Sequence, residues 1–408
     1  MENNKISSEL KYYLYIVFTN LRFTRIINVI FIVQFLKLSL VQFAFFQSIF
    51  LFSQLISEVP SGILGDIFNK KKVVLLGLIM LTITPLLTIS SSVLATKEYI
   101  YYILIVAFIL DGVGNAFLSG ADDALFFEAL RSEGKQESYG KIRGKLQLIC
   151  ALTLGGATFL GSGLYSIKIY LPYLVQSFTL LCAAIIIMVT PDNQSLTVEN
   201  QFREDTTKFK ELFSVFHRMI KSSRILFMFI FTTVTVSTIN VVFAFLPNYF
   251  SKIGFSNFTN GAIFMVFSII GGIVATQAYK ISKIQISRLI QIISMILVVS
   301  ILFQILPYST AFIISLSLLY IIIDILDPII MEMLHLWVDD ESRATIISGL
   351  SFSISLVTML VTPIIGVGVQ MFKMKTTILL ISIFIILMVL FSYILIEKTR
   401  RRKQYENR

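Results

Sequence analysis

Charged side chains inside long apolar stretches are the residues of this chain whose type and position could do chemistry. Five of them lie well inside such stretches: Arg22, Arg25, Asp111, Asp324 and Asp327. A charge at the centre of a membrane costs about 3 kcal/mol on insertion scales, so these side chains should face protein or water rather than lipid. Each is therefore a candidate for binding a substrate or for exchanging a proton near neutral pH.

The elements that must position these residues are membrane-spanning helices. Of the 408 residues, 56% are hydrophobic and 14% charged, whereas ordinary soluble domains are about 45–50% apolar. Twelve apolar segments approach the ~20 residues that cross a bilayer as a helix. They cover residues 12–34, 42–64, 73–94, 100–121, 144–166, 169–190, 225–249, 258–278, 287–306, 310–331, 346–368 and 376–396. Their continuous hydrophobicity predicts an all-α polytopic membrane protein and excludes a membrane β-barrel.

The distribution of basic residues sets the expected orientation in the membrane. The net charge is +10. With the N-terminus inside, 26 of the 34 lysines and arginines fall in cytoplasmic segments and only six in outer loops. The positive-inside rule then predicts a multi-pass protein of the cell membrane with both termini in the cytoplasm. The lipid bilayer accounts for the basic composition, so no nucleic-acid partner is expected.

One polar and basic stretch, residues 58–75, separates two apolar runs. Gly62 and Gly65 allow close helix approach, and three consecutive lysines from Lys70 would anchor a helix end at the cytoplasmic face. This stretch resembles the loop between helices 2 and 3 of the major facilitator superfamily, a family of membrane transporters. The matching residues are Gly62, Leu64, Asp66, Lys70 and Lys71, while Ile67 and Asn69 stand where the family prefers Arg and Gly.

The resemblance implies a role in conformational change for this stretch and for related positions. The residues expected to act in gating are Glu58, Gly62, Gly65, Asp66, Lys70, Lys71, Arg143 and Arg343. A faded copy of the motif follows in the second half of the chain, where Gly272 and Lys280 match Gly62 and Lys70. Thr276 replaces the aspartate there, so the two copies have diverged.

The resemblance also implies twelve helices in two pseudo-symmetric halves. We assign residues 1–190 to an N-terminal half, 191–224 to a cytoplasmic linker with an amphipathic helix, and 225–408 to a C-terminal half with a basic tail. A glycine-rich fifth helix should pack closely against its neighbours. Its glycines are Gly155, Gly156, Gly161 and Gly163. We expect the protein to act as a monomer.

In the family fold, helices 1, 4, 7 and 10 line a central cavity. The five charged residues fall on helices 1, 4 and 10, and helix 7 adds uncharged polar groups. The implied site for substrate and proton coupling contains Arg22, Arg25, Asp111, Asn240, Asp324 and Asp327. Two roles remain open for the arginines, which could pair with Asp111 or bind substrate. Family schemes built on an arginine in helix 4 do not transfer, because Phe108 occupies that position.

The leading functional interpretation is a secondary active transporter that works by alternating access. Because the chain resembles bacterial twelve-helix drug/proton antiporters, we expect a proton-coupled exporter of small amphipathic or cationic molecules such as drugs. One alternative is uptake of a small nutrient such as a sugar, an amino acid or a peptide. A second alternative is a membrane receptor of the same fold that does not transport.

An enzyme is the main interpretation from a different class. The chain contains no H-E-x-x-H, G-x-S-x-G or C-x-x-C motif and no phosphate-binding loop. These motifs carry metal, nucleophilic, redox and nucleotide chemistry, so their absence argues against catalysis and against ATP-driven transport by this chain alone. We expect no cofactor and no metal site.

Overall fold

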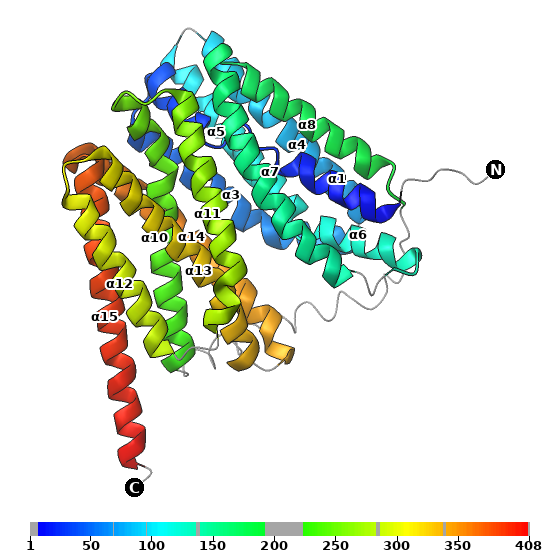
Figure 1. Ribbon diagram of the computed structural model, residues 1–408. Helices are drawn as coiled ribbons and strands as arrows, with labels where there is room; N and C mark the ends of the chain where they lie inside the picture. The colour runs from blue at the N-terminus through cyan, green and yellow to red at the C-terminus, as the bar shows by residue number, and fades with distance from the viewer. Residues whose placement is uncertain are drawn as a thin grey trace. The chain divides into compact units, whose positions relative to one another are not determined.

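The computed structural model describes residues 7–67, 69–94, 96–135, 139–191, 223–282, 286–337 and 340–406. Every regular element in these residues is a helix (Figure 1). Eleven helical segments are long and apolar enough to cross a membrane, in agreement with the predicted all-α membrane fold. The amphipathic helix predicted for the linker falls in 192–222, outside the described residues.

The chain groups into two compact units. The first contains residues 1–198 and 247–269, and the second contains residues 199–246 and 270–408. The predicted halves, 1–190 and 225–408, differ from this grouping in residues 247–269. This segment follows the predicted linker in sequence but groups with the first unit. The division into two six-helix halves stays a prediction.

The helices of the first unit follow one another along the N-terminal part of the chain. They are α1 (Ser8–Asn20), α2 (Ile27–Ile30), the π-helix η1 (Phe31–Phe35), α3 (Leu40–Ile67), α4 (Lys70–Ser90), the 3-10 helix η2 (Ser91–Val93), α5 (Lys97–Leu118), α6 (Ala121–Ser132), α7 (Tyr139–Ile167) and α8 (Leu171–Met188). The helices that follow are α10 (Ser223–Lys252), α11 (Asn257–Ser282), α12 (Ile286–Ile305), α13 (Ser309–Trp337), α14 (Asp340–Phe372) and α15 (Met374–Glu406). Both units contribute to α10 and α11.

The first predicted span, residues 12–34, is not a continuous helix, and this expectation is corrected. Helix α1 ends at Asn20, and helical structure resumes only at Ile27 in α2 and η1. Of the connecting residues, 23–26 form turns, and 21 and 22 have no regular structure. This segment, called the break below, contains both arginines of the predicted site.

Local hydrogen bonds explain where α1 stops. The Asn20 amide donates to the carbonyl oxygen of Ile16 at 2.9 Å. Beyond it, the N–H and the hydroxyl of Thr24 both donate to Oε1 of Gln176 in α8, at 3.0 and 2.9 Å. Short polar side chains compete with helical pairing in this way. A break at membrane depth is tolerated where protein groups satisfy the freed backbone.

Gly161 of α7 provides the space that the break occupies. A Cβ atom at this position would collide with the carbonyl oxygen of Phe23. Among the other predicted packing glycines, Gly155 makes only ordinary contacts, and a Cβ at Gly156 or Gly163 would meet no described atom within 4 Å. The close approach is therefore concentrated at Gly161.

The helical piece after the break has its own anchor. Gln34 in η1 donates from Nε2 to Oδ1 of Asn248 at 2.9 Å and accepts from the hydroxyl of Ser251 at 3.0 Å. Both partners lie at the C-terminal end of α10, in the part that groups with the first unit. The side-chain amide of Gln34 thus has a partner for its oxygen and for its nitrogen.

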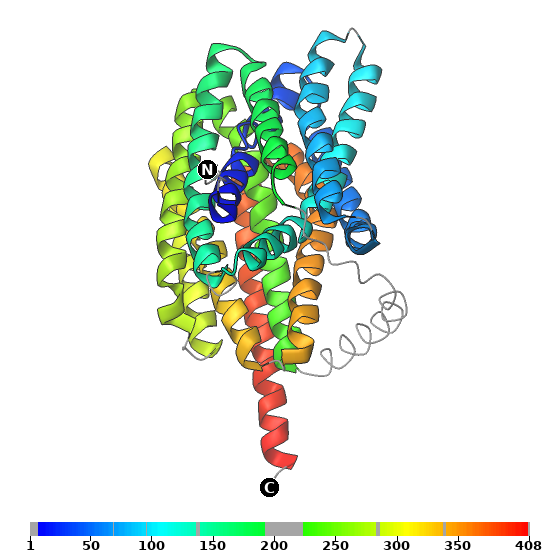
Figure 2. The ribbon, with the colours of Figure 1, turned by 90° about the vertical axis from the view of Figure 1, so that its right-hand side faces the viewer.

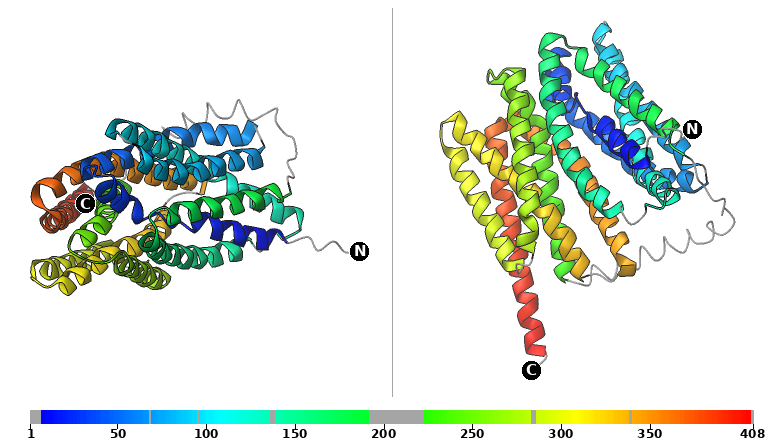
Figure 3. Two further views of the ribbon diagram at one scale, coloured as in Figure 1. Left: turned by 90° about the horizontal axis from the view of Figure 1, so that it is seen from above. Right: turned by 45° about the vertical axis from the view of Figure 1, so that its right-hand side comes forward.

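The piece before the break packs between α7 and α8 and also contacts α6, as the ribbon views show (Figures 1 and 3). The ring of Tyr12 stacks on that of Phe126 in α6, with the ring centroids 4.5 Å apart. Tyr12 and Tyr15 are fully buried. Helix α1 is therefore held by aromatic packing at the end that lies away from the break.

In the second unit, the last helix, α15, continues well beyond its apolar segment. Its membrane-spanning window ends at Phe391, but the helix continues to Glu406. Figure 2 shows this end projecting beyond the other helices of the unit. The predicted basic tail thus begins as a continuation of the last helix.

Replacing Gly161 by alanine should destabilise the first unit, because the new β-carbon must displace the carbonyl oxygen of Phe23. Overpacking of this kind costs about 1–3 kcal/mol. Gly163→Ala, on the same helix but with no described atom in its way, is the matched control. Thermal unfolding of the purified protein measures both variants, and equal melting temperatures would contradict the close packing of the break.

Candidate functional site

The break in the first span borders a polar cavity within the first unit. The cavity has a volume of about 180 Å³. Its walls come from the region of the break and from α3, α4, α5 and α8. The lining residues are Thr19, Leu21, Arg22, Thr24, Arg25, Asn28, Gln47, Phe50, Leu81, Thr84, Phe108, Asp111, Gln176 and Leu180. Three of the six predicted site residues, Arg22, Arg25 and Asp111, therefore border one cavity.

A chain of hydrogen bonds joins two of these residues. Nη2 of Arg22 donates to Oδ1 of Asn115 at 2.6 Å. The amide nitrogen of Asn115 donates in turn to Oδ1 of Asp111 at 2.9 Å and to the Asp111 carbonyl oxygen at 2.7 Å. Asn115 thus connects the cation of the break to the carboxylate of α5. Arg22 and Asp111 are paired through this asparagine.

Asn115 is the candidate site residue that sequence reasoning missed. It lies four residues after Asp111 in α5, so the two side chains share one helix face. This four-residue spacing is the feature of the sequence that could have identified Asn115. An asparagine can accept from a guanidinium with its oxygen while it donates to a carboxylate with its nitrogen, which suits it to this position.

Amide and hydroxyl groups complete the polar wall of the cavity. Gln176 is held by Thr24 through its oxygen, and Gln47 enters from α3. Oδ1 of Asn28 is buried and accepts no hydrogen bond from the described residues. A buried acceptor without a partner is costly, so the cavity should supply water or a ligand to Asn28.

The other three predicted site residues, Asn240, Asp324 and Asp327, belong to the second unit. Asp324 of α13 packs against Gly271 of α11, where a Cβ would collide with the carboxylate. The ring of Tyr320, one helical turn earlier, contacts Phe243 of α10 with the ring centroids 5.1 Å apart. Asn240 of α10 is exposed. The Asp327 side chain lies outside the described part of the chain.

The basic motif between α3 and α4 makes specific contacts inside the first unit. Lys70 forms an ion pair with Glu128 of α6. Lys71 donates to the carbonyl oxygens of Met188 and Thr190 at 2.7 and 2.8 Å, at the C-terminal end of α8. A cation is favourable there because the last carbonyls of a helix are unpaired and carry negative partial charge.

For the other predicted gating residues, the structure gives the helix in which each lies but few of the contacts. Glu58 is partly buried near the end of α3. Gly62, Gly65 and Asp66 follow it in the same helix, Arg143 lies in α7 and Arg343 in α14. The surroundings of these five residues lie outside the described part of the chain, so their gating role stays a prediction.

Two acidic residues at the start of α6 hold the buried tyrosines of α1. Tyr15 donates to Asp122 at 3.0 Å, and Tyr12 donates to Asp123. Gly120 precedes them with a φ of 78°, a left-handed conformation that glycine adopts without strain. The carboxylates therefore occupy the N-terminal turn of α6, where negative charge is favourable.

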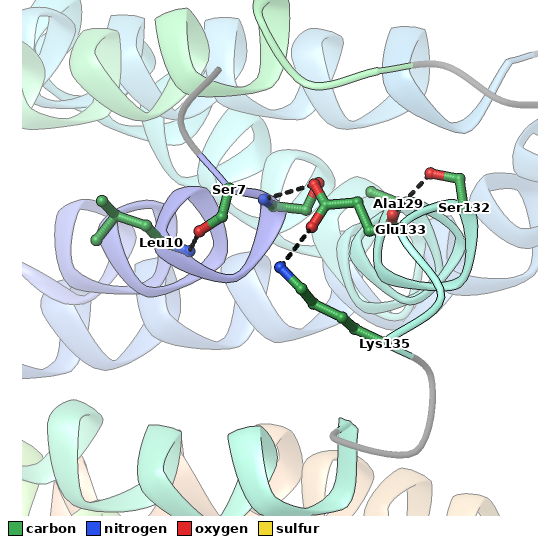
Figure 4. A network of polar contacts seen from close by, with 7 residues as sticks. Ser7, Leu10, Ala129, Ser132, Glu133 and Lys135 are labelled. Atoms are coloured by element: carbon green, nitrogen blue, oxygen red, sulfur yellow. Dashed lines mark hydrogen bonds and ion pairs between the residues drawn. The ribbon is translucent and has the colours of Figure 1, made fainter. Parts of the chain in front are cut away.

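A third polar contact joins the other ends of α1 and α6 (Figure 4). The N–H and hydroxyl of Ser8 donate to Oε1 of Glu133 at 2.9 and 2.6 Å, and Nζ of Lys135 lies 3.2 Å from Oε2. Partial burial raises the pKa of the Glu133 carboxyl, but the hydrogen bonds from Ser8 and the charge of Lys135 outweigh it. The net effect is a pKa below the usual value of 4.5.

Comparison with protein families gives the class of protein. The Major Facilitator Superfamily matches residues 14–326, which is most of the chain, so the protein belongs to this superfamily. It is a multi-pass membrane protein and a secondary transporter, and the superfamily consists of transporters rather than enzymes. A search of curated protein sequences finds no match.

Solved structures of the same fold resemble the chain over nearly its whole length. A variant of the nucleoside transporter NupG is 12% identical with a TM-score of 0.74, covering 94% of this chain and 98% of that one. A D-xylose–proton symporter is 12% identical with a TM-score of 0.68, covering 95% and 96%. A bacterial homologue of the human lysosomal transporter Spinster is 12% identical with a TM-score of 0.71, covering 95% of each chain.

The Ser8–Glu133 contact predicts a dependence of stability on pH. Because folding lowers the pKa of Glu133, the charged carboxylate stabilises the protein above its usual pKa of 4.5, and this contribution is lost as the pH falls through the folded-state value. Glu133→Gln should therefore lower the melting temperature at neutral pH and have less effect in acid. Glu98→Gln, at an exposed glutamate, is the control. An equal loss at every pH would contradict this role.

Proposed function

We propose that this transporter couples the movement of a small polar solute to protons and that Asp111 is the group that exchanges the proton. The observation that carries this proposal is the Arg22–Asn115–Asp111 chain at the edge of the cavity. Protonation of Asp111 removes the negative charge that faces Arg22 through Asn115. Arg22 then becomes available to a solute, so the proton and the solute are linked through one guanidinium.

The size and lining of the cavity favour a small polar solute. Pockets for drug-sized ligands usually have volumes of about 300–1,000 Å³ and mostly apolar walls. This cavity is smaller, at about 180 Å³, and it has three amides and two guanidinium groups in its wall. A small polar nutrient is therefore the solute class that the geometry supports best, and we propose that the transporter takes it up. Nucleosides and D-xylose, named for similar structures, belong in a substrate panel.

Export of amphipathic or cationic molecules is the second candidate, and a different observation favours it. Asp324 packs beside Gly271 in the second unit, and the neighbouring Tyr320 meets Phe243 edge to face. A carboxylate close to aromatic rings suits a cationic ligand. This candidate assigns the proton or the substrate cation to Asp324 rather than to Asp111.

We also propose that the protein works as a monomer in the cell membrane with both termini in the cytoplasm. The excess of basic residues in the expected cytoplasmic segments supports this orientation. In the same proposal, Lys70 and Lys71 link α6 and α8 to the start of α4. Changes in those contacts would accompany alternating access.

Asp111→Asn tests the proposed proton coupling in proteoliposomes. The variant should lose accumulation driven by a proton gradient but keep solute counterflow, because counterflow requires binding and conformational exchange without net proton movement. Glu98→Gln, which removes an exposed carboxylate outside the cavity, should keep both activities. Asp324→Asn is measured beside it with nucleosides, D-xylose and cationic dyes. Gradient-driven transport by Asp111→Asn would refute the assignment, and selective loss of dye export in Asp324→Asn would favour the second candidate.

A further inference from the structure

We propose that the carboxamide side chains of Asn28, Gln47 and Gln176, called the carboxamide set below, bind a small neutral polyol in the cavity of the first unit. This inference rests on the proposed function, because it names the solute of the same cavity. All three side chains border the cavity, and they come from three different elements, α2, α3 and α8. Carboxamides carry no charge, so they recognise a solute by hydrogen bonds.

The break holds two members of the carboxamide set through one residue, Thr24. The N–H and the hydroxyl of Thr24 donate to Oε1 of Gln176 at 3.0 and 2.9 Å. The carbonyl oxygen of Thr24 accepts the backbone N–H of Asn28 at 2.9 Å. These contacts do not use the side-chain nitrogen of Gln176, which keeps two N–H donors for the cavity. The break therefore positions two recognition groups as well as the arginines.

Close packing between helices supports the other walls of the cavity. Phe50, one turn after Gln47 in α3, places its carbonyl oxygen against Gly112 of α5, where a Cβ atom would collide with it. In α8, the hydroxyl of Ser177 donates to the carbonyl oxygen of Thr82 in α4 at 2.9 Å. Helices that approach each other this closely hold their side chains in defined positions, as is usual for ligand sites that are largely formed before the ligand binds.

Two members of the carboxamide set have unused hydrogen-bonding capacity at the cavity. Oδ1 of Asn28 is buried and has no hydrogen-bond partner among the described residues. Gln47 is partly buried, and no hydrogen bond joins its side chain to another residue of the described part of the chain. A buried polar atom without a partner costs free energy, which a bound donor recovers. The cavity therefore requires a solute that donates as well as accepts.

Hydroxyl groups on adjacent carbon atoms match the edge of a carboxamide. A carboxamide presents an acceptor oxygen and a donor nitrogen side by side. One hydroxyl of the pair can donate to the oxygen while the other accepts from the nitrogen. A hydroxyl also donates and accepts at once, so it can bridge two carboxamides. A short chain or ring with several vicinal hydroxyls can therefore satisfy the whole carboxamide set.

Other neutral solutes fit the lining less well. A nucleobase has its hydrogen-bonding groups only along its rim, and its flat faces require stacking partners. The carboxamide set reaches the cavity from three elements, which suits hydroxyl groups that point in several directions. A purely apolar solute would leave the oxygen of Asn28 without a donor. The volume of about 180 Å³ equals the liquid share of about six water molecules, so the polyol is small.

The charged residues near the cavity keep separate roles when the solute is neutral. Arg22 is bonded to Asn115, which is bonded to Asp111, and Glu58 of α3 lies outside the lining. A neutral solute brings no charge that competes for Arg22. In the proposed function Arg22 becomes available when Asp111 is protonated, and its N–H groups then add a hydrogen bond to a hydroxyl oxygen.

Equilibrium dialysis of the purified full-length protein with radiolabelled xylitol and D-xylose tests this inference. Pentane-1,5-diol has the same carbon chain without vicinal hydroxyls and is the matched competitor. Uracil, lactate and choline represent flat, anionic and cationic solutes. Unlabelled xylitol or D-xylose should displace the label at concentrations about tenfold lower than any of these competitors, because each competitor leaves members of the carboxamide set without partners.

Substitutions in the carboxamide set separate recognition from folding. Asn28→Leu should weaken xylitol binding about tenfold without lowering the melting temperature, because Oδ1 of Asn28 has no described partner to lose. Gln47→Leu should behave in the same way. Gln54→Leu, on the same helix but outside the lining, is the matched control and should bind xylitol like the parent. A merely structural role would lower the melting temperature together with the binding.

Several results would overturn the inference. One is that xylitol and D-xylose bind no more tightly than pentane-1,5-diol. Another is that uracil, lactate or choline binds more tightly than either polyol. A third is that polyol binding is unchanged in both Asn28→Leu and Gln47→Leu. Each of these outcomes would exclude a polyol held by the carboxamide set.

Asp111→Asn distinguishes a failure of this inference from a failure of the proposed function. The variant should bind xylitol like the parent, since the carboxamide set is unchanged, but lose accumulation driven by a proton gradient in proteoliposomes. If polyols do not bind while Asp111→Asn abolishes proton-driven accumulation of another solute, the proposed function stands and this inference fails. If polyols bind through the carboxamide set and Asp111→Asn still accumulates them with protons, the proposed function fails and this inference stands.

Discussion

The organisation of the first unit depends on one constraint, which is that a break in a membrane-spanning helix must satisfy its own backbone. Lipid offers no hydrogen bonds, so non-helical residues at that depth need protein or water as partners. Thr24 finds its partner in Gln176 of α8, and Gly161 of α7 lets the Phe23 carbonyl approach. Once these contacts exist, two arginines can stand at membrane depth beside a polar cavity.

The same constraint links local sequence to the chemistry of the site. A continuous helix would distribute Arg22 and Arg25 along its surface at fixed angles. The break frees their backbone from helical geometry and places both side chains on the cavity that Asp111 borders from α5. Asn115 then bridges Arg22 and Asp111 through two hydrogen bonds. The site is thus a product of interrupted secondary structure rather than of a catalytic motif.

Much of the fold could be predicted from the sequence because a long continuous apolar run in a membrane forms a spanning helix. The break could not, since Phe23, Ile26 and Ile27 continue the apolar pattern. The contacts that stabilise the interruption, with Gln176 and Gly161, come from residues distant in sequence. The charged residues of the cavity were identified because each is costly in lipid. Asn115 carries no charge, so the same criterion did not select it, although its spacing from Asp111 pointed to it.

The separate anchoring of the two pieces of the first span has a mechanical consequence. Helix α1 is tied to α6 through Tyr12 and Tyr15, whereas η1 is tied to the end of α10 through Gln34. A rigid rod would transmit any rotation at one end to the other. Here the turns interrupt the helix, so each piece is held by its own partners and not by helical hydrogen bonds to the other piece.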